Sequence, residues 1–273
     1  MSRPFRFGVV ATPDGGPEKW TATARRVEEL GYSTLLMPDG LQLLSPFPSL
    51  AVAASVTTSL RVGTFVLASP LRTPYAAAWD AHSLTVLSGG RFDLGIGTGR
   101  PAVQEFAERI GLPFGSAGQR LTQVERTIEH LRELDGEQCT PVLMAASGPK
   151  ARSLAGRVAD IVTLAAGALT PRAEVVAMAE SVRESAGERA ADVELAMNIF
   201  VVGEEVPAWT QSFIGADAAT LIEHDSLTML RGTTDEIVDE LQRRRDTIGV
   251  SYISVNAAFF EQLAPVVERL AGK

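Results

Sequence analysis

Short apolar runs alternate along this chain with longer segments in which apolar residues recur at helical spacing. The short runs are rich in β-branched residues and predict strands, whereas the longer segments predict amphipathic helices. One such helix aligns Trp20, Ala24 and Val27 on one face. Gly31 follows this helix and is suited to end it in the left-handed conformation. We expect strands at residues 5–10, 33–37, 61–67, 91–96, 142–145, 160–164, 194–202 and 251–255.

The expected strands and helices form eight βα units without an internal linker. Consecutive strands joined by a helix pair in parallel, because the crossover is long enough only for a helix that lies across the sheet. We therefore expect residues 1–273 to form a single (β/α)8 TIM barrel domain, and an open doubly wound sheet is the structural alternative. Residues 203–232 are the weakest part of the pattern and are interpreted as irregular helices near the barrel mouth. There Trp209 and Phe213 would form a lid or cover the core.

The charge balance limits the partners of the protein. The chain has 33 acidic and 25 basic residues, a net charge of −8, which disfavours binding to nucleic acid or to an anionic membrane. No apolar run approaches the ~20 residues of a membrane span, and the start lacks the core of a signal peptide. We therefore expect a cytoplasmic protein that acts on a small molecule.

Metal and disulfide chemistry are also disfavoured. Cys139 is the only cysteine, so the chain cannot form an internal disulfide. His82, His130 and His224 lie far apart without the spacing of a zinc motif, and we expect no metal site. His82 is expected to pack or cap a helix, and His224 is a weaker candidate to reach the mouth.

Few ionisable residues fall in the loops after the expected strands, where a barrel of this type places its chemistry. They are Asp14, Asp39, Arg72, Arg100 and Lys150. We find no Ser-His-Asp order, no carboxylate pair and no metal cluster that would activate water or a nucleophile. A mouth with so few reactive side chains instead favours a large planar cofactor that supplies its own reactivity.

Two glycine-containing turns are candidates to hold an anion. At residues 145–149, AASGP, a strand turns directly into a helix start, where free amides and the Ser147 hydroxyl favour a phosphate. The alternative is an ordinary serine N-cap followed by proline. The second turn, GIGTG at residues 95–99, is similar to a dinucleotide fingerprint but lacks its glycine spacing, so it is a weak signal.

Several motifs follow one another along the chain. The longest is LSGGRFDLGIGTG at residues 87–99. The others are ARRVEELGY at 24–32, PD at 38–39, RVGT at 61–64, RTP at 72–74, AASGP at 145–149 and GVSYISV at 249–255. As a set, these motifs closely resemble the luciferase-like monooxygenases and the coenzyme F420-dependent oxidoreductases of the bacterial luciferase-like superfamily.

This resemblance implies a barrel whose mouth binds coenzyme F420 or, alternatively, FMN. It also implies a homodimer. The cofactor phosphate would lie on the turn of Ala146, Ser147, Gly148 and Pro149. A non-proline cis peptide bond, Phe65–Val66, would form a bulge after Thr64 that supports the central ring. Thr98 and Gly99 would line the same pocket.

Two positions depart from the family pattern. Deazaflavin-dependent members often have Asp-His after the second strand, where this chain has Asp39 and Gly40. Asp39 remains the candidate catalytic residue, orienting substrate or polarising a water, unless it only caps the following loop. Some members carry an acid where this chain has Arg100, which would attract an anionic substrate or cofactor tail, or else is a solvated loop residue.

Three functions follow from these observations. The first is an oxidoreductase that transfers a hydride between reduced coenzyme F420 and a small organic substrate. The second is an FMNH2-dependent monooxygenase. The third is a non-catalytic barrel that acts as a binding module, which is suggested by the missing acids and by the short connection at residues 135–140.

Overall fold

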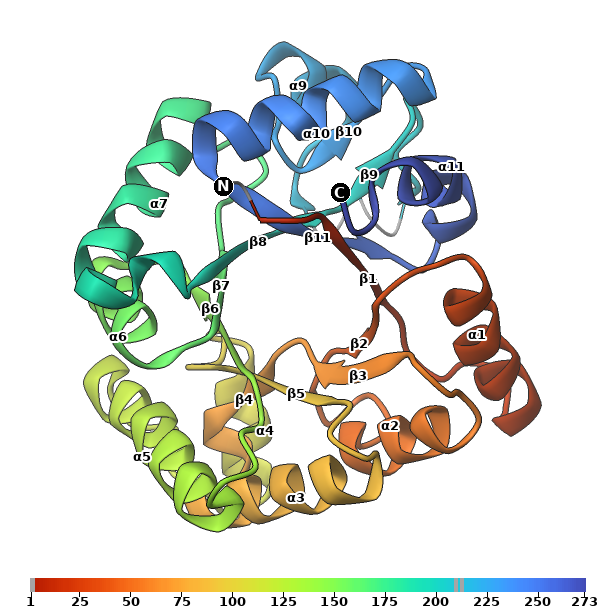
Figure 1. The fold of residues 1–273 in the computed structure, drawn as a ribbon. Helices are drawn as coiled ribbons and strands as arrows, with labels where there is room; N and C mark the ends of the chain where they lie inside the picture. Colours follow the sequence, from red (N-terminus) through yellow and green to blue (C-terminus); the bar gives the residue numbers. More distant parts are fainter. Residues whose placement is uncertain (1–2, 209–210, 212–213) are drawn as a thin grey trace.

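A computed structural model shows a closed barrel of parallel strands surrounded by helices (Figure 1), and it describes residues 3–208, 211 and 214–273. The strands are hydrogen-bonded in the order β3-β2-β1-β11-β8-β7-β6-β5-β4, and the additional pairing of β3 with β5 closes the ring. Because β3 and β4 are two halves of one broken strand, the ring has eight strand positions. The predicted (β/α)8 barrel is therefore confirmed.

The strands of the barrel are β1 (Arg6–Val10), β2 (Thr34–Met37), β3 (Arg61–Thr64), β4 (Leu67–Ala68), β5 (Phe92–Gly97), β6 (Val142–Ala146), β7 (Ile161–Leu164), β8 (Glu194–Ile199) and β11 (Val250–Asn256). The α-helices are α1 (Pro17–Glu29), α2 (Pro46–Ser55), α3 (Pro74–Leu87), α4 (Val103–Arg109), α5 (Ala117–Asp135), α6 (Pro149–Val158), α7 (Arg172–Ala186), α9 (Ala218–Glu223), α10 (Thr234–Ile248) and α11 (Phe260–Leu270). Short 3-10 turns lie at Ser69–Leu71 and Gly187–Ala191.

Local signals in the sequence explain where the helices begin and end. The helix α10 starts with a capping box, in which Thr233 and Glu236 satisfy each other's backbone N–H groups. It ends at Gly249, whose φ of 86° is the left-handed conformation that glycine adopts without strain. Proline occupies the first turn of α1, α2, α3 and α6, where its missing N–H costs no helical hydrogen bond.

Alternation of side chains along the strands produces two cores. Outward-facing residues pack against the helices and form the main core. Inward-facing residues fill the middle of the barrel, and five of them form a separate buried layer: Leu36, Leu143, Ile161, Ala196 and Tyr252. This apolar layer is the floor of the space above it, at the carboxyl ends of the strands.

A polar cluster closes the amino end of the barrel. Arg6 Nε lies 3.4 Å from Glu194 Oε2, and Arg61 Nη2 donates to Asp93 Oδ1 at 2.5 Å. Burial raises the pKa of the Glu194 carboxyl. Polar clusters at this end of a barrel stabilise the fold, because catalytic residues collect at the opposite end. Cys139 is exposed in the turn that precedes β6, also at the amino ends of the strands.

The structure corrects three element predictions in the first half of the chain. The third strand is not continuous over 61–67 but is interrupted after Thr64, and the Phe65–Val66 peptide bond between its halves is cis, as the resemblance implied. The second helix, which the sequence pattern predicts from about residue 48 to residue 59, begins and ends earlier, at Pro46 and Ser55. The short helix α4 was missed, because its seven residues hold only one buried residue and give no helical stripe.

The stretch 203–232 is only partly helical. It contains α9, but it also contains β10 (Met229–Leu230), which pairs in parallel with β9 (Val201–Val202) outside the barrel. Such a pairing joins residues far apart in the chain, and a local pattern does not reveal it. Trp209 and Phe213, expected to act as a lid or a cover, lie outside the described residues. Among the residues that are described, no helix has the length and apolarity needed to cross a bilayer.

Candidate functional site

A cavity of about 850 Å³ lies at the carboxyl ends of the strands, above the inner apolar layer. Asp39, Phe65, Val66, Thr98, Gly99, Arg100 and Ser147, all expected at the site, line it. The other expected residues lie beside it: Thr64 and Ala146 are buried in the adjoining strands, and Gly148 and Pro149 begin the helix α6. The structure therefore brings the expected residues together around one space. Their roles remain predictions.

The bulge after β3 forms one wall of this cavity. The Phe65 N–H donates to the Met37 carbonyl at 2.7 Å, and the Thr64 hydroxyl donates to the Gly95 carbonyl at 2.6 Å. A Cβ on Gly95 would lie 1.8 Å from Thr64 O, and one on Gly97 would lie 2.9 Å from Val66 Cγ2. Gly95 and Gly97 of the GIGTG motif are therefore explained by the bulge that packs against them, and a dinucleotide fingerprint is not needed.

Asp39 fixes the rim next to the bulge. Its Oδ2 accepts hydrogen bonds from Arg72 Nη1 at 2.6 Å and from the Ala68 N–H at 3.0 Å, and its Oδ1 accepts from Arg72 Nη2 at 3.2 Å. Three N–H donors therefore surround this carboxylate. This geometry ties the end of β2 to the chain that follows the bulge.

The turn between β6 and α6 is open to the cavity. Gly148 is the N-cap of α6, and no side chain caps the helix, so Ser147 is not the ordinary N-cap that was the alternative interpretation. Ser147 is exposed, and its carbonyl accepts a hydrogen bond from Arg152. A Cβ on Gly148 would meet nothing within 4 Å. The first amides of α6 and the Ser147 hydroxyl therefore remain available to an anion at the positive end of the helix dipole.

Three polar residues across the cavity were missed in the sequence. Thr163, Asn198 and Asn256 line the cavity from β7, β8 and β11. They lie two residues beyond Ile161, Ala196 and Ser254 on the same inward face of each strand. Inward-facing positions recur at every second residue of a strand, so counting onward from the apolar layer would have predicted that these three side chains face the cavity.

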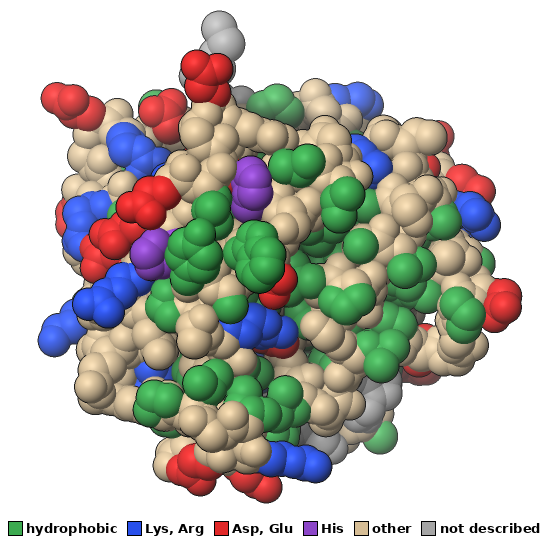
Figure 2. All heavy atoms as spheres, turned by 90° about the horizontal axis from the view of Figure 1, so that it is seen from below, with side chains coloured by type: hydrophobic (Ala, Val, Ile, Leu, Met, Phe, Trp, Pro, Cys, Tyr) green, Lys and Arg blue, Asp and Glu red, His purple; other side chains and the backbone are tan. Residues whose placement is uncertain are grey.

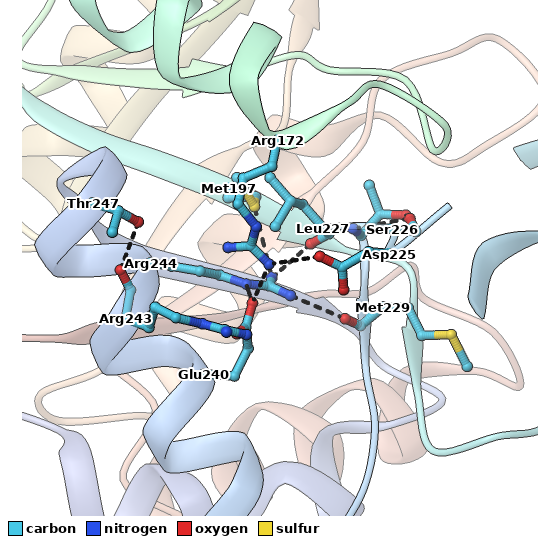
Figure 3. Close-up of polar contacts among 11 residues, drawn as sticks. Arg172, Met197, Asp225, Ser226, Leu227, Met229, Glu240, Arg243, Arg244 and Thr247 are labelled. Atoms are coloured by element: carbon cyan, nitrogen blue, oxygen red, sulfur yellow. Dashed lines mark hydrogen bonds and ion pairs between the residues drawn. The ribbon is translucent and has the colours of Figure 1, made fainter. Parts of the chain in front are cut away.

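A buried ion-pair cluster supports the same side of the cavity (Figure 3). Arg244 on α10 is 2% exposed and donates to the Leu227 carbonyl at 2.6 Å and to the Met229 carbonyl at 3.2 Å. Its Nε donates to Glu240 Oε1 at 2.6 Å, and Arg172 at the start of α7 donates to the same oxygen at 2.9 Å. Because Leu227 lines the cavity, Arg244 holds part of the cavity wall in place.

The charges in this cluster are strongly coupled. Burial opposes ionisation of Glu240, but hydrogen bonds from Arg244, Arg243 and Arg172 outweigh it and lower the Glu240 pKa to about 2. Burial lowers the pKa of Arg244, and Glu240 opposes this shift. No pattern in the sequence indicates this cluster, because arginines on a helix usually lie on the solvated face.

His82 and His224 lie outside the set of residues that line the cavity. His82 Nδ1 lies 2.8 Å from Asp135 Oδ1, which agrees with the expected packing role. His224 ends α9, and its Nδ1 lies 3.0 Å from the Thr220 carbonyl. Neither residue is among those that line the cavity.

A bulge with a cis peptide bond, and an open helix start two strands further around the ring, form the arrangement that the family resemblance implied. A family model described as luciferase-like monooxygenase matches residues 3–208. This chain belongs to that family. The luciferase-like match covers β1 to β9 and therefore includes the bulge, the Asp39 rim and the turn at residues 145–149.

Relatives of this luciferase-like chain include enzymes of known activity. The F420-dependent glucose-6-phosphate dehydrogenase of Microbacterium testaceum is 29% identical over 192 residues, which cover 59% of this chain and 56% of that protein. The chain spans about half the length of the curated relatives it matches.

Solved structures show the same fold. The coenzyme F420-dependent tetrahydromethanopterin reductase from Methanopyrus kandleri has a TM-score of 0.75 at 18% identity, and the alignment covers 98% of both chains. A riboflavin lyase with modified FMN and riboflavin has a TM-score of 0.76 at 15% identity, with 98% of this chain and 93% of that chain covered. At these identities the similarity establishes the barrel alone.

Proposed function

We propose that this protein is an oxidoreductase that transfers a hydride between coenzyme F420 and a small organic substrate in the cavity at the barrel mouth. The observation that carries the proposal is the pairing of the Phe65–Val66 bulge with the open turn at Ser147 around one cavity. The F420-dependent relatives support it.

The residues present fit a flavin-type cofactor. Gly97 leaves room for the bulge, and Gly148 leaves the helix start open. The Thr163 hydroxyl oxygen is buried with no hydrogen-bond partner among the described residues, and Thr163 lines the cavity, so a molecule bound beside the cofactor would satisfy it.

Each group of cavity residues has a defined task in this proposal. Phe65 and Val66 would support the ring, and Thr98 and Gly99 would border it. The Ser147 hydroxyl, with amides from the turn that runs from Ala146 to Pro149, would hold the phosphate. In its reduced form, bound F420 would supply the hydride, so the protein would need only to orient the reactants and keep water out.

Two charged residues complete the proposed site. Arg100 would attract the anionic part of the cofactor. Asp39 would orient the substrate side of the rim through its bonds to Arg72 and Ala68, because its carboxylate already accepts three hydrogen bonds. We therefore assign Asp39 an orienting role ahead of a proton-donating one.

An FMNH2-dependent monooxygenase is the second candidate. The family description and the riboflavin lyase similarity support it. The same turn would hold the phosphate of FMN, so the site residues are shared and the cofactor separates the two functions.

Titration of the purified protein with F420 and with FMN, followed by fluorescence, tests these proposals. Quenching by F420 alone supports hydride transfer, and quenching by FMN alone supports the monooxygenase. Binding of neither cofactor would favour the non-catalytic barrel. Ser147→Glu should abolish binding by placing a carboxylate where the phosphate lies, whereas Ser55→Glu, at the exposed end of α2, should not. An unchanged dissociation constant for Ser147→Glu would reject the phosphate position.

We also propose that the protein forms a homodimer. The helix α3 exposes Tyr75, Trp79 and Leu87, which are 54%, 60% and 80% exposed, and Figure 2 shows apolar side chains gathered on this side of the molecule. Exposed apolar patches of this kind mark interaction surfaces. Trp79→Glu should convert a dimer to a monomer in light scattering, and a monomeric wild-type protein would refute the proposal.

A further inference from the structure

The cavity has two chemically different sides. The bulge side carries Phe65, Val66 and the charged residues Asp39 and Arg100. The other side carries Thr163, Asn198 and Asn256, which we call the neutral polar wall. The strand order places β8, which holds Asn198, four strands from β3 in both directions around the ring, so this wall lies opposite the bulge.

The neutral polar wall is built on neighbouring strands. β7 pairs with β8, and β8 pairs with β11, with Asn198 directly beside Ser254. The chain contains only two asparagines in 273 residues, and both are in this wall. A residue type otherwise absent from the chain thus occurs only at the cavity.

Hydrogen bonds within the protein fix the orientation of both amides. Asn198 Oδ1 accepts from the Ser254 hydroxyl at 2.8 Å, and Asn256 Oδ1 accepts from the Ala258 N–H at 2.8 Å. The amide oxygens are therefore engaged, and the Nδ2 groups are the donors that each side chain offers. Thr163 is 4% exposed, and its hydroxyl oxygen has no partner among the described residues.

These groups favour an uncharged ligand with a hydrogen-bond acceptor. A carbonyl oxygen would replace water at two amide donors and lose little on leaving solvent. A carboxylate or phosphate at the same wall would lose its hydration without gaining a cation, because the wall itself contains no ionisable side chain. We propose that the neutral polar wall is the substrate subsite and that it selects uncharged, carbonyl-bearing molecules over anionic ones. This inference rests on the proposed function, in which the bulge supports the cofactor.

Matched ligand pairs test this selectivity. Binding of cyclohexanone against cyclohexanecarboxylate, and of acetophenone against benzoate, is measured by ligand-observed NMR on the protein with and without F420. Each ketone should bind at least about 10-fold more tightly than its carboxylate. The reason is that the ligand's carboxylate would be buried at the neutral polar wall without a cation to pair with its charge. Equal or tighter binding of the carboxylates would overturn the proposal, and so would the absence of binding by every ketone.

Amide-to-acid variants then isolate the two donors. Asn198→Asp and Asn256→Asp keep the oxygens that bond to Ser254 and Ala258 and replace only the Nδ2 groups. Each should weaken ketone binding about 10-fold at neutral pH, and acidification should restore part of it, because a protonated carboxyl donates again. Gln242→Glu, an exposed amide-to-acid change on α10, should have no effect.

The F420 dissociation constant separates this inference from the proposed function. It should be the same in Asn198→Asp, Asn256→Asp and the wild-type protein. If it rises while ketone binding is unchanged, the wall holds the cofactor and the subsite assignment is wrong. If the wild-type protein binds neither F420 nor FMN, the proposed function fails, while the ketone measurements without cofactor still decide the selectivity of the wall.

Discussion

Arg72 donates two hydrogen bonds to the Asp39 carboxylate, at 2.6 Å to Oδ2 and at 3.2 Å to Oδ1. Asp39 follows β2, and Arg72 lies beyond the bulge, 33 residues later in the chain. Their ion pair therefore sets the distance between two segments that border the cavity. Since the side chains are 3% and 19% exposed, solvent screens the pair only weakly.

Replacement of Asp39 by Asn should lower the free energy of unfolding by about 2 kcal/mol, because Arg72 then keeps only neutral acceptors. In a double-mutant cycle with Arg72→Met, the two effects should be non-additive in urea unfolding. Asp14→Asn, in an exposed pair with Lys19, is the control and should not change stability measurably. Additive effects of Asp39→Asn and Arg72→Met would show that the pair is not coupled.

Gly95→Ala should destabilise the protein by at least about 3 kcal/mol, because its new methyl group would overlap the Thr64 carbonyl oxygen. Gly118→Ala is the matched change in α5, where the nearest atom to the new Cβ is 4.0 Å away. That variant should gain about 0.5–1 kcal/mol from the higher helix propensity of alanine. Urea denaturation followed by circular dichroism would measure the change in the free energy of unfolding for both variants. Equal stability of the two variants would contradict the close contact between β5 and the bulge.

Arg244→Met should lower the free energy of unfolding by about 3–5 kcal/mol, because it removes the buried guanidinium that donates to Glu240 and to two backbone carbonyls. Arg243→Met, which removes an exposed partner of the same carboxylate, should have a much smaller effect. Hydrogen exchange should speed up at residues 226–230 in Arg244→Met alone. If that variant does not fold, Arg172→Gln should give the same local pattern with a smaller loss of stability.

The pH dependence of stability should report on Glu240. Its pKa in the folded protein is about 2, below the ordinary 4.5, so its carboxylate contributes stability that is fully present above pH 4.5. This contribution is lost as the pH falls from 4.5 towards 2. Glu240→Gln should be less stable than the wild-type protein at pH 7, and the difference should shrink across that window. A difference independent of pH would exclude this carboxylate as its source.

The repeating units of the barrel could be predicted because each strand and helix leaves a local pattern. β-branched residues identify Arg61 to Thr64, and the glycine after α10 identifies its end. The bulge could not be derived from such patterns, and it was expected only because the motifs resembled a family. The break between β3 and β4 depends on contacts with β5, which lies about 30 residues away.

The cavity could be predicted on one side only. Its loop residues, such as Ser147 and Arg100, belong to recognisable motifs. Asn198 and Asn256 lie within or at the end of strands that otherwise read as apolar, so their inward direction became evident from the register of β8 and β11. Arg244 was missed for a physical reason, because its burial depends on carbonyl groups from a distant segment that the helix sequence does not reveal.

The single thiol of the protein has a practical consequence. Cys139 is exposed in the turn before β6, while the cavity opens beyond the other ends of the strands. A maleimide dye or a surface linker would therefore attach at one defined atom and leave the opening facing the solution. Immobilised in this way, every molecule would present the same orientation to a flowing ligand.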